Sequence, residues 1–125
     1  MSDLIYQQET YDIIGICMEV HKFLGHGFRE IVYKDAIEVE ADLRNIAFCR
    51  EKEFCINYKG HTLKHTYNAD FVVFDKIILE IKATENGLAD DTICQTINYL
   101  KASGCKVGLI ANFGRSKLEY KRLIF

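Results

Sequence analysis

The sequence predicts an α/β protein in which a mixed β-sheet is flanked by helices, in the order α-α-β-β-β-α-β-β. Two observations predict this class. Apolar residues recur at helical spacing over the first 44 residues, and from residue 53 they alternate with polar ones, as in half-buried strands. At 125 residues, with no proline and no low-complexity stretch, the chain is expected to form one domain over 1–125.

The predicted elements follow from these patterns. A first helix over 4–24 ends at Gly25-His26-Gly27, because glycine tolerates the left-handed backbone that closes a helix. Two more helices are expected over 30–44 and 90–102. The predicted strands cover 53–58, 66–74, 77–81, 107–111 and 118–124. Turns are expected at Lys59-Gly60-His61 and near Asp75-Lys76.

Composition limits the class of protein. Hydrophobic residues make up 49% and charged residues 27%, which argues against disorder. No window approaches the roughly 18 consecutive apolar residues of a membrane helix. The first residues carry acids and no basic segment, so a cytoplasmic protein without membrane contact is expected. The five cysteines fit reduced thiols; Cys17 and His21 lie four apart on a predicted helix, but further ligands at zinc-site spacing are absent.

Charge is distributed unevenly along the chain. The net charge is −2, but residues 101–125 contain six basic residues against the single acid Glu119, or +5, and the first hundred residues carry −7. This asymmetry suggests a phosphate-facing patch near the C-terminal end. A solvated surface is the alternative.

The residues with the clearest chemistry lie in NADFVVFDKIILEIKA, at 68–83. Asp70 stands before an apolar run, and Glu80 and Lys82 end another. Ionised groups in apolar strands are costly to bury unless they are paired or bind a cation. Glu80 and Lys82 are two residues apart and therefore project from one face of their strand.

Two carboxylates that meet at one point repel each other, and a hard divalent ion such as Mg²⁺ neutralises the pair through oxygen ligands. The backbone carbonyl of Ile81 is a natural further ligand. Lys82 would then orient or help deprotonate a metal-bound water, and such a site hydrolyses a phosphodiester. The alternative is a salt bridge between Glu80 and Lys82 on a solvated face, with Asp70 capping a turn.

The connection between the two strands decides whether Asp70 and Glu80 meet. A two-residue turn at Asp75-Lys76 would pair Asp70 with Ile81 and turn it away from Glu80. An even register, from a three-residue loop at Phe74-Asp75-Lys76 or from a bulge, brings the two carboxylates together. We predict one of these two arrangements.

Three motifs in order resemble the GxxExxY proteins, a family of small, mostly bacterial proteins assigned to the PD-(D/E)XK nuclease superfamily. The signature GxGFxExVY appears as GHGFREIVY at 25–33. The segment YNADFVVFDKIILEIKA at 67–83 is similar to the family's core, as is INYLKASGCKVGLIANFG at 97–114, followed by LEYKR at 118–122. The resemblance spans about residues 10–124.

The resemblance implies a restriction-endonuclease-like core, α-β-β-β-α-β, with an extra N-terminal helix and a C-terminal strand. It places Asp70 and Glu80 at the metal positions and makes Lys82 the catalytic lysine. Glu30 matches an acid that many members bring to the same metal; a surface acid favoured by the helix dipole is the alternative. Ala69 stands where the superfamily's proline would be, but proline is not a metal ligand.

Gln95 and Tyr99 resemble the QxxxY motif of RecB-like nucleases, in which both residues lie beside the active site. They are four apart and so share one face of their helix. A core tyrosine with an exposed glutamine would give the same letters.

The predicted function is Mg²⁺- or Mn²⁺-dependent hydrolysis of nucleic-acid phosphodiester bonds, structure-selective or weakly sequence-specific, with DNA favoured over RNA. A homodimer is expected if both strands of a duplex are cut. The residues expected to bind the phosphate backbone are Lys59, Lys64, Arg115, Lys117, Lys121 and Arg122. The alternative is a catalytically silent nuclease-fold module that binds nucleic acid or a protein partner.

Overall fold

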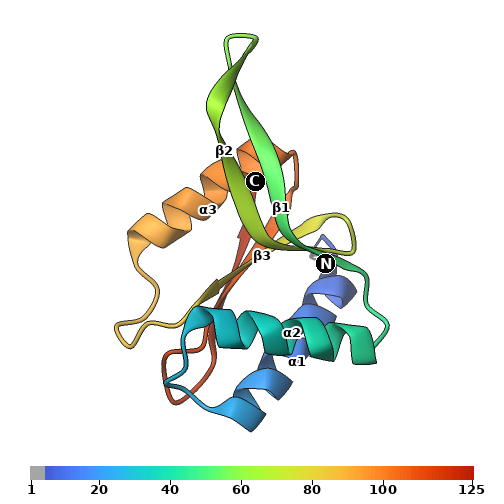
Figure 1. Ribbon diagram of the computed structural model, residues 1–125, viewed down its shortest axis with the longest axis vertical. Coiled ribbons are helices and arrows are strands. Elements are labelled where there is room, and N and C mark those ends of the chain that lie inside the picture. Colours follow the sequence, from blue (N-terminus) through green and yellow to red (C-terminus); the bar gives the residue numbers. More distant parts are fainter. Residues whose placement is uncertain (1–4) are drawn as a thin grey trace, which may run out of the picture.

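The computed structural model of the protein describes residues 5–125. Helices and strands follow one another in the predicted order (Figure 1). They are α1 (Gln7–Leu24), α2 (Glu30–Leu43), β1 (Phe48–Tyr58), β2 (His61–Val73), β3 (Ile77–Lys82), α3 (Asp90–Ser103), β4 (Val107–Asn112) and β5 (Glu119–Ile124). The predicted start of the first helix at residue 4 lies outside the described residues. The order α-α-β-β-β-α-β-β is confirmed.

The five strands form one sheet in the order β1-β2-β3-β4-β5. Neighbouring strands are antiparallel except for β3 and β4, which are parallel. A parallel pair needs a crossover connection, and α3 supplies it between β3 and β4. The predicted mixed sheet is therefore confirmed.

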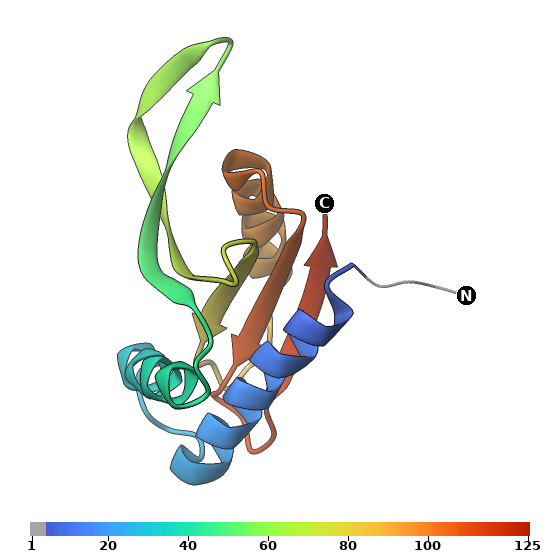
Figure 2. The same cartoon turned by 90° about the vertical axis from the view of Figure 1, so that its right-hand side faces the viewer.

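Helices cover both faces of the sheet (Figure 2). One apolar cluster joins α1 and α2 to the odd-numbered residues of β3, such as Leu79 and Ile81. The other joins α3 to the even-numbered side, where Ile78 and Ile110 lie. Glu80 and Lys82 share the parity of Ile78, so they belong to the α3 face of the sheet. Within residues 5–125, no helix is long and apolar enough to span a bilayer.

The GHGFREIVY motif builds the turn between α1 and α2. Gly25 has φ 68° and Gly27 has φ 112°, conformations that favour glycine. The hydroxyl of Tyr33, a fully buried residue, donates a hydrogen bond to the carbonyl of Gly25 over 2.6 Å. Its ring stacks on Phe113 with the centroids 4.6 Å apart. The motif therefore docks this turn onto the end of β4.

The hairpin of β1 and β2 is longer than the sequence predicted. β1 begins at Phe48 rather than 53, and β2 begins at His61 rather than 66. β2 pairs with β3 only over Phe71–Val73, so the rest of the hairpin has no third strand. Figures 1 and 2 show it projecting beyond the rest of the molecule. Residues 61–66 are all exposed, so they carry none of the apolar alternation that would predict a strand. We call residues 54–69 of this hairpin the arm.

Candidate active site

A three-residue loop sets the register of β2 against β3. Phe71 lies opposite Leu79 and Val73 lies opposite Ile77, which leaves Phe74, Asp75 and Lys76 as the loop. Phe74 and Asp75 both have positive φ, at 56° and 59°, which is uncommon for residues other than glycine. The pairing ends at Phe71 and Leu79, and the same even register, extended by one position, brings Asp70 beside Glu80. The predicted three-residue loop is confirmed.

The two carboxylates take over the hydrogen bonds of the strand ladder at this point. The backbone N–H of Asp70 donates to Glu80 Oε2 over 3.0 Å, and the N–H of Ile81 donates to Asp70 Oδ2 over 2.8 Å. Glu80 is only 7% exposed. The alternative of a salt bridge between Glu80 and Lys82 on a solvated face is therefore wrong, because Glu80 is buried against Asp70.

Lys34 of α2 is the cation beside this pair. Its Nζ donates to Asp70 Oδ1 over 3.1 Å and to Glu51 Oε1 over 2.5 Å, and its side chain is 11% exposed. Burial alone would lower the pKa of Lys34, but the hydrogen bonds to Glu51 and Asp70 outweigh it and raise the pKa. The ammonium group therefore stays charged and neutralises Asp70.

Glu80 is the group whose ionisation is most altered. Burial, followed by repulsion from the Asp70 carboxylate, raises the pKa of Glu80 from 4.5 to about 8. The hydrogen bond from the Asp70 backbone and the charges of Lys82 and Lys34 act in the opposite direction. The positive charge of the neighbouring lysines is thus too small to keep both carboxyl groups ionised at one point.

Two tyrosines form a wall beside the carboxylates. The rings of Tyr67 in β2 and Tyr99 in α3 stack with centroids 3.4 Å apart and planes inclined by 14°. Burial raises the pKa of both hydroxyls, and the charges of Glu80 and Asp70 raise it further. The Tyr67 hydroxyl is buried and has no hydrogen-bond partner among the described residues. Both phenols therefore lie within the electrostatic reach of the pair.

The family model for the PD-(D/E)XK nuclease superfamily matches residues 7–123, which include both carboxylates and Lys82. The chain belongs to this superfamily. It is also similar to a solved structure, the crystal structure of SSO0001, with a TM-score of 0.59 and 20% sequence identity. That match covers 95% of this chain and 59% of SSO0001, so the chain spans less than two thirds of this relative. No curated protein matches the chain.

At 20% identity the likeness to SSO0001 concerns the fold alone. Together with the mixed five-stranded sheet and its three flanking helices, it confirms the predicted restriction-endonuclease-like fold of the superfamily. The sequence predicted that the Asp-x(9)-Glu-x-Lys string, Asp70 to Lys82, is the core of the site. The structure brings Asp70 and Glu80 of that string into contact through each other's backbone.

Glu30 does not join the two carboxylates. It is exposed in the first turn of α2, as the helix-dipole alternative described. No three acidic, histidine or cysteine side chains within residues 5–125 lie close enough together to hold an ion. Lys34, one helical turn further along α2, contacts Asp70 instead. A metal-binding role for Glu30 stays a prediction.

The QxxxY pair is split between two environments. Gln95 is exposed, whereas Tyr99 is partly buried by its stack on Tyr67. This is the pattern of a core tyrosine with an exposed glutamine, yet Tyr99 also lies beside the carboxylates. A role for Gln95 stays a prediction.

The donor set fits a hard divalent cation. Asp70 in β2 and Glu80 in β3 supply carboxylate oxygens. The backbone carbonyl of Ile81, the residue between Glu80 and Lys82, is a further candidate ligand. Mg²⁺ typically takes one or two protein carboxylates and completes its shell with water and substrate phosphates, so a third carboxylate is not required. Burial and the Asp70 carboxylate raise the pKa of Glu80, and a bound cation would act against both causes by favouring the ionised form.

The six residues predicted to bind phosphate do not form one surface. Lys59 and Lys64 are exposed on the arm, whereas Arg115 and Lys117 lie in the β4–β5 connection at the opposite end of the molecule (Figures 1 and 2). Lys121 is exposed on β5. Arg122 is partly buried and its guanidinium donates to the Ile5 carbonyl. Arg122 is thus held by an internal contact, and phosphate binding by the exposed cations near the C-terminal end stays a prediction.

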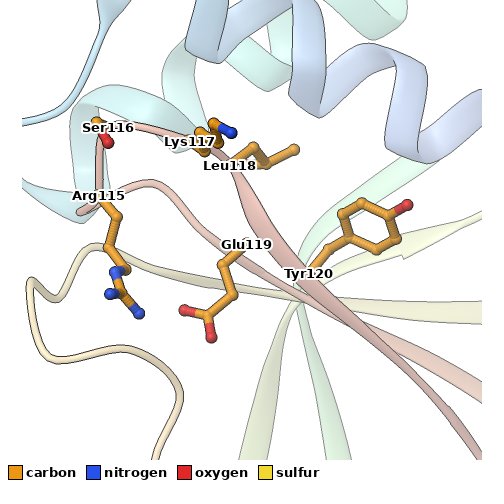
Figure 3. Close-up of a pocket in the computed structure, with 6 residues that line it drawn as sticks. All are labelled: Arg115, Ser116, Lys117, Leu118, Glu119 and Tyr120. Atoms are coloured by element: carbon orange, nitrogen blue, oxygen red, sulfur yellow. The ribbon is translucent and has the colours of Figure 1, made fainter.

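The β4–β5 connection surrounds a hollow of about 470 Å³ that does not include the carboxylate pair (Figure 3). Arg115 and Glu119 extend to the same side of this connection. Both lie against Gly87 in the segment that follows β3. The pairing of β3 with β4 ends at Lys82 and Asn112. Arg115 therefore lies against the segment that follows Lys82, beyond the end of β3.

Asn112 holds that segment in place, a role that no pattern in the sequence predicted. Its Oδ1 accepts the N–H groups of Thr84 and Gly114, over 2.9 and 3.1 Å. Its Nδ2 donates to the Thr84 carbonyl over 2.9 Å and to Glu119 Oε1 over 3.0 Å. A Cβ on Gly114 would lie 2.3 Å from the Thr84 nitrogen, so only glycine allows this approach.

Replacing Asn112 by alanine is expected to lower the free energy of unfolding by about 3 kcal/mol, because it leaves buried donors and acceptors unpaired. Chemical denaturation measures this. Asn57→Ala is the control, because Asn57 is exposed and bonds only Thr62, and it should change stability by no more than about 0.5 kcal/mol. A loss at Asn112 no larger than at Asn57 would contradict the assigned role.

The metal-free protein is expected to become less stable as the pH rises from about 5 to about 8. Glu80 binds its proton more tightly in the folded protein than in the unfolded chain, where its pKa is 4.5. Its contribution to stability is therefore complete below that value and is lost on the way to about 8, by up to about 1.4 kcal/mol per pH unit. Urea titrations in EDTA at several pH values measure the slope. Glu80→Gln removes the titrating group, and an equal slope in this variant would contradict the assignment.

Cys17 and His21, which are four residues apart in α1, both have structural roles. Cys17 is buried, and burial raises the pKa of its thiol to about 12. The ring Nε2 of His21 lies 2.9 Å from the carbonyl oxygen of Arg115, which ties the β4–β5 connection to α1. A buried thiol beside a partly exposed histidine is what the lack of further ligands predicted.

Proposed function

We propose that this chain is a divalent-metal-dependent nuclease that hydrolyses phosphodiester bonds, with DNA favoured over RNA. The observation that carries the proposal is the meeting of Asp70 and Glu80 at one point, in a chain of the PD-(D/E)XK superfamily. Asp70, Glu80 and the Ile81 carbonyl would hold Mg²⁺ or Mn²⁺. When bound, the ion would polarise the phosphodiester and acidify a water.

The residues around the ion have separable tasks. Lys82 follows Glu80 on the same face of β3, where its ammonium would orient the attacking water and offset charge that develops on the phosphate. Tyr67 and Tyr99 close one side of the site and limit its contact with water. Lys117 and Arg115, beyond the end of β3, would contact the nucleic-acid backbone. Little surface remains for base contacts, so weak sequence specificity or selection by structure is expected.

We further propose that the chain belongs to the GxxExxY proteins within the superfamily. The support is the GHGFREIVY motif, in which the positive φ of Gly25 and the hydrogen bond from the Tyr33 hydroxyl to the Gly25 carbonyl stabilise the α1–α2 turn. A homodimer is part of the proposal, because cutting both strands of a duplex requires two sites. Light scattering with and without duplex DNA tests this point.

The test of the function is a panel of labelled substrates: linear, nicked, branched and single-stranded DNA, and RNA. Each is incubated with Mg²⁺, Mn²⁺ or EDTA. We expect cleavage only with metal, no cleavage by Glu80→Gln, and full cleavage by Glu85→Gln, a matched change at an exposed acid three residues beyond Lys82. Cleavage that survives in Glu80→Gln would show that the activity comes from another site or from a contaminant.

A second candidate is a catalytically silent module that binds nucleic acid. The observation in its favour is the Lys34–Asp70 ion pair, which already neutralises one of the two carboxylates. Calorimetry separates the candidates. Binding of Mn²⁺ that is lost in Asp70→Asn supports the nuclease, and absence of any Asp70-dependent binding supports the module.

A further inference from the structure

The outer part of the arm projects from the sheet, and the base of the arm lies next to the carboxylate site, because Tyr67 is beside the carboxylates and Asp70 directly follows the arm. From His61 to Asp70, β2 pairs only with β1, so the arm is a two-stranded ribbon without a third strand. It ends in a two-residue turn at Lys59-Gly60, both with positive φ, between the paired residues Tyr58 and His61. Such turns match the natural twist of a hairpin. The pairing is closed at the tip by Tyr58 and His61, and it is interrupted once, by a bulge between Cys55 and Asn57 where residues 63–65 lie on the opposite strand.

Isolated two-stranded hairpins are marginally stable in water, so the arm needs an anchor. An aromatic stack provides it. Phe54 of β1 stacks on Tyr67 of β2 with centroids 5.7 Å apart, and Tyr67 stacks on Tyr99 of α3. The base of the arm is thus fixed to the body of the protein, while its outer half, including residues 57–66, is exposed.

The arm is also free of acidic residues. Residues 54–69 contain no aspartate or glutamate, although the whole chain has a net charge of −2. They contain Lys59, Lys64, His61 and His65, all exposed. The outer half of the arm also exposes Tyr58 and Leu63, but these are two single side chains, and the absence of acids beside two lysines favours a polyanion as the partner.

We propose that the arm enters the major groove of a B-form DNA duplex, so that the substrate of the proposed nuclease is double-stranded DNA. The inference rests on the proposed function and adds the class of substrate. A two-stranded ribbon fits the major groove of B-DNA, which is about 12 Å wide. The major groove of A-form RNA is too narrow and deep for it, and a single strand offers no groove.

The length of the arm supports the same duplex. The ten residues from Asp70 to Gly60 span at most roughly 33 Å at about 3.3 Å per residue. One turn of B-form DNA is about 34 Å. The tip can therefore sit in the groove while a phosphodiester about one helical turn away reaches the carboxylate pair at the base. Asn57 and Thr62, whose side chains bond each other over 3.1 Å near the tip, are polar groups able to face base edges.

The experiment measures binding in EDTA, so that binding is separated from cleavage. Fluorescence anisotropy compares a DNA duplex of more than two helical turns with RNA duplex and single-stranded DNA of the same sequence, over a range of salt concentrations. The arm variant is Lys59→Ala with Lys64→Ala. The matched control is Lys22→Ala with Lys106→Ala, which removes the same charge from exposed lysines off the arm.

We expect the wild type to prefer the DNA duplex. In the arm variant, the preference disappears and the slope of log K against log salt falls by about 2, because each lysine that neutralises a phosphate adds about one unit to that slope. The control keeps both the preference and the slope. Equal binding of the RNA duplex by the wild type, or equal effects in the arm variant and the control, would overturn the proposal.

The outcome for the arm is distinguishable from the outcome for the nuclease. DNA binding that depends on the arm, without metal-dependent cleavage, would keep the arm and remove the proposed catalysis. Cleavage that depends on Glu80 but is unchanged in rate and substrate choice by the arm variant would keep the catalysis and remove the arm.

Discussion

Lys82→Ala is expected to cleave about 10²–10⁴-fold more slowly than the wild type while binding metal with undiminished affinity. Lys82 is partly exposed at the end of β3, two residues after Glu80 and on the same face. Its charge lowers the pKa of Glu80, so the ammonium lies near the carboxylate pair. None of the ion pairs within residues 5–125 engages it. Its charge is therefore available to water and phosphate.

Single-turnover rates on the best substrate of the panel, beside calorimetric titration with Mn²⁺, measure the two halves of this prediction. Lys106→Ala is the matched control, because it removes an exposed lysine from another part of the surface. Lys82→Arg keeps the charge but not the geometry and should recover only part of the rate. If metal affinity and cleavage rate fell together in Lys82→Ala, Lys82 would contribute to metal binding rather than to the hydrolysis step.

The features that follow from strand periodicity were predictable from the sequence. Glu80 and Lys82 share a face because they are two residues apart, and this requires no tertiary information. The meeting of Asp70 with Glu80 depended on one further quantity, the length of the loop at Phe74. The chemistry demanded an even register, and the three-residue loop provides it.

Lys34 was missed although the sequence contains a signal for it. Lys34, Ile37 and Ala41 are spaced by three and four, and all three are buried on one face of α2. A lysine in line with two core residues needs an anionic partner. The identity of that partner could not be predicted, because Asp70 and Glu51 lie on strands whose position against α2 is set by the packing of the whole sheet.

Asn112 and the arm were missed for different reasons. Asn112 satisfies four hydrogen bonds across connections that no local pattern describes. The arm carries no apolar alternation between His61 and Thr66, because neither of its faces is buried there. Periodicity reveals strands that cover a core, and it is silent about strands that meet solvent, or a ligand, on both faces.

Lys34→Met is expected to tighten Mg²⁺ or Mn²⁺ binding by tenfold or more, which corresponds to about 1.4 kcal/mol. The ammonium of Lys34 lies 3.1 Å from Asp70 Oδ1, so it neutralises a carboxylate that a divalent ion would need. Two cations beside one carboxylate repel each other. Binding of the ion therefore requires Lys34 to withdraw toward Glu51, which is half-exposed and already bonded to it over 2.5 Å.

The same substitution is expected to destabilise the metal-free protein by roughly 3 kcal/mol, because it leaves Asp70 beside Glu80 without a counter-charge. Saturating metal should close most of this gap, since a ligand that binds only the folded state stabilises it by mass action. Urea titrations in EDTA and in excess Mn²⁺ measure both quantities. Lys34→Arg retains the cation and should retain the weaker metal affinity.

The changes in metal affinity and in metal-free stability together show whether Lys34 competes with the ion for Asp70 or holds Asp70 in place for it. If Lys34 competes with the ion, Lys34→Met binds metal more tightly although its metal-free form is less stable. If Lys34 instead holds Asp70 in place for the ion, affinity and stability fall together. In the first case the lysine is a resident counter-ion that keeps two buried acids compatible with folding before metal arrives. The site can then form first and accept its ion afterwards, which explains how a pair with such repulsion remains in place.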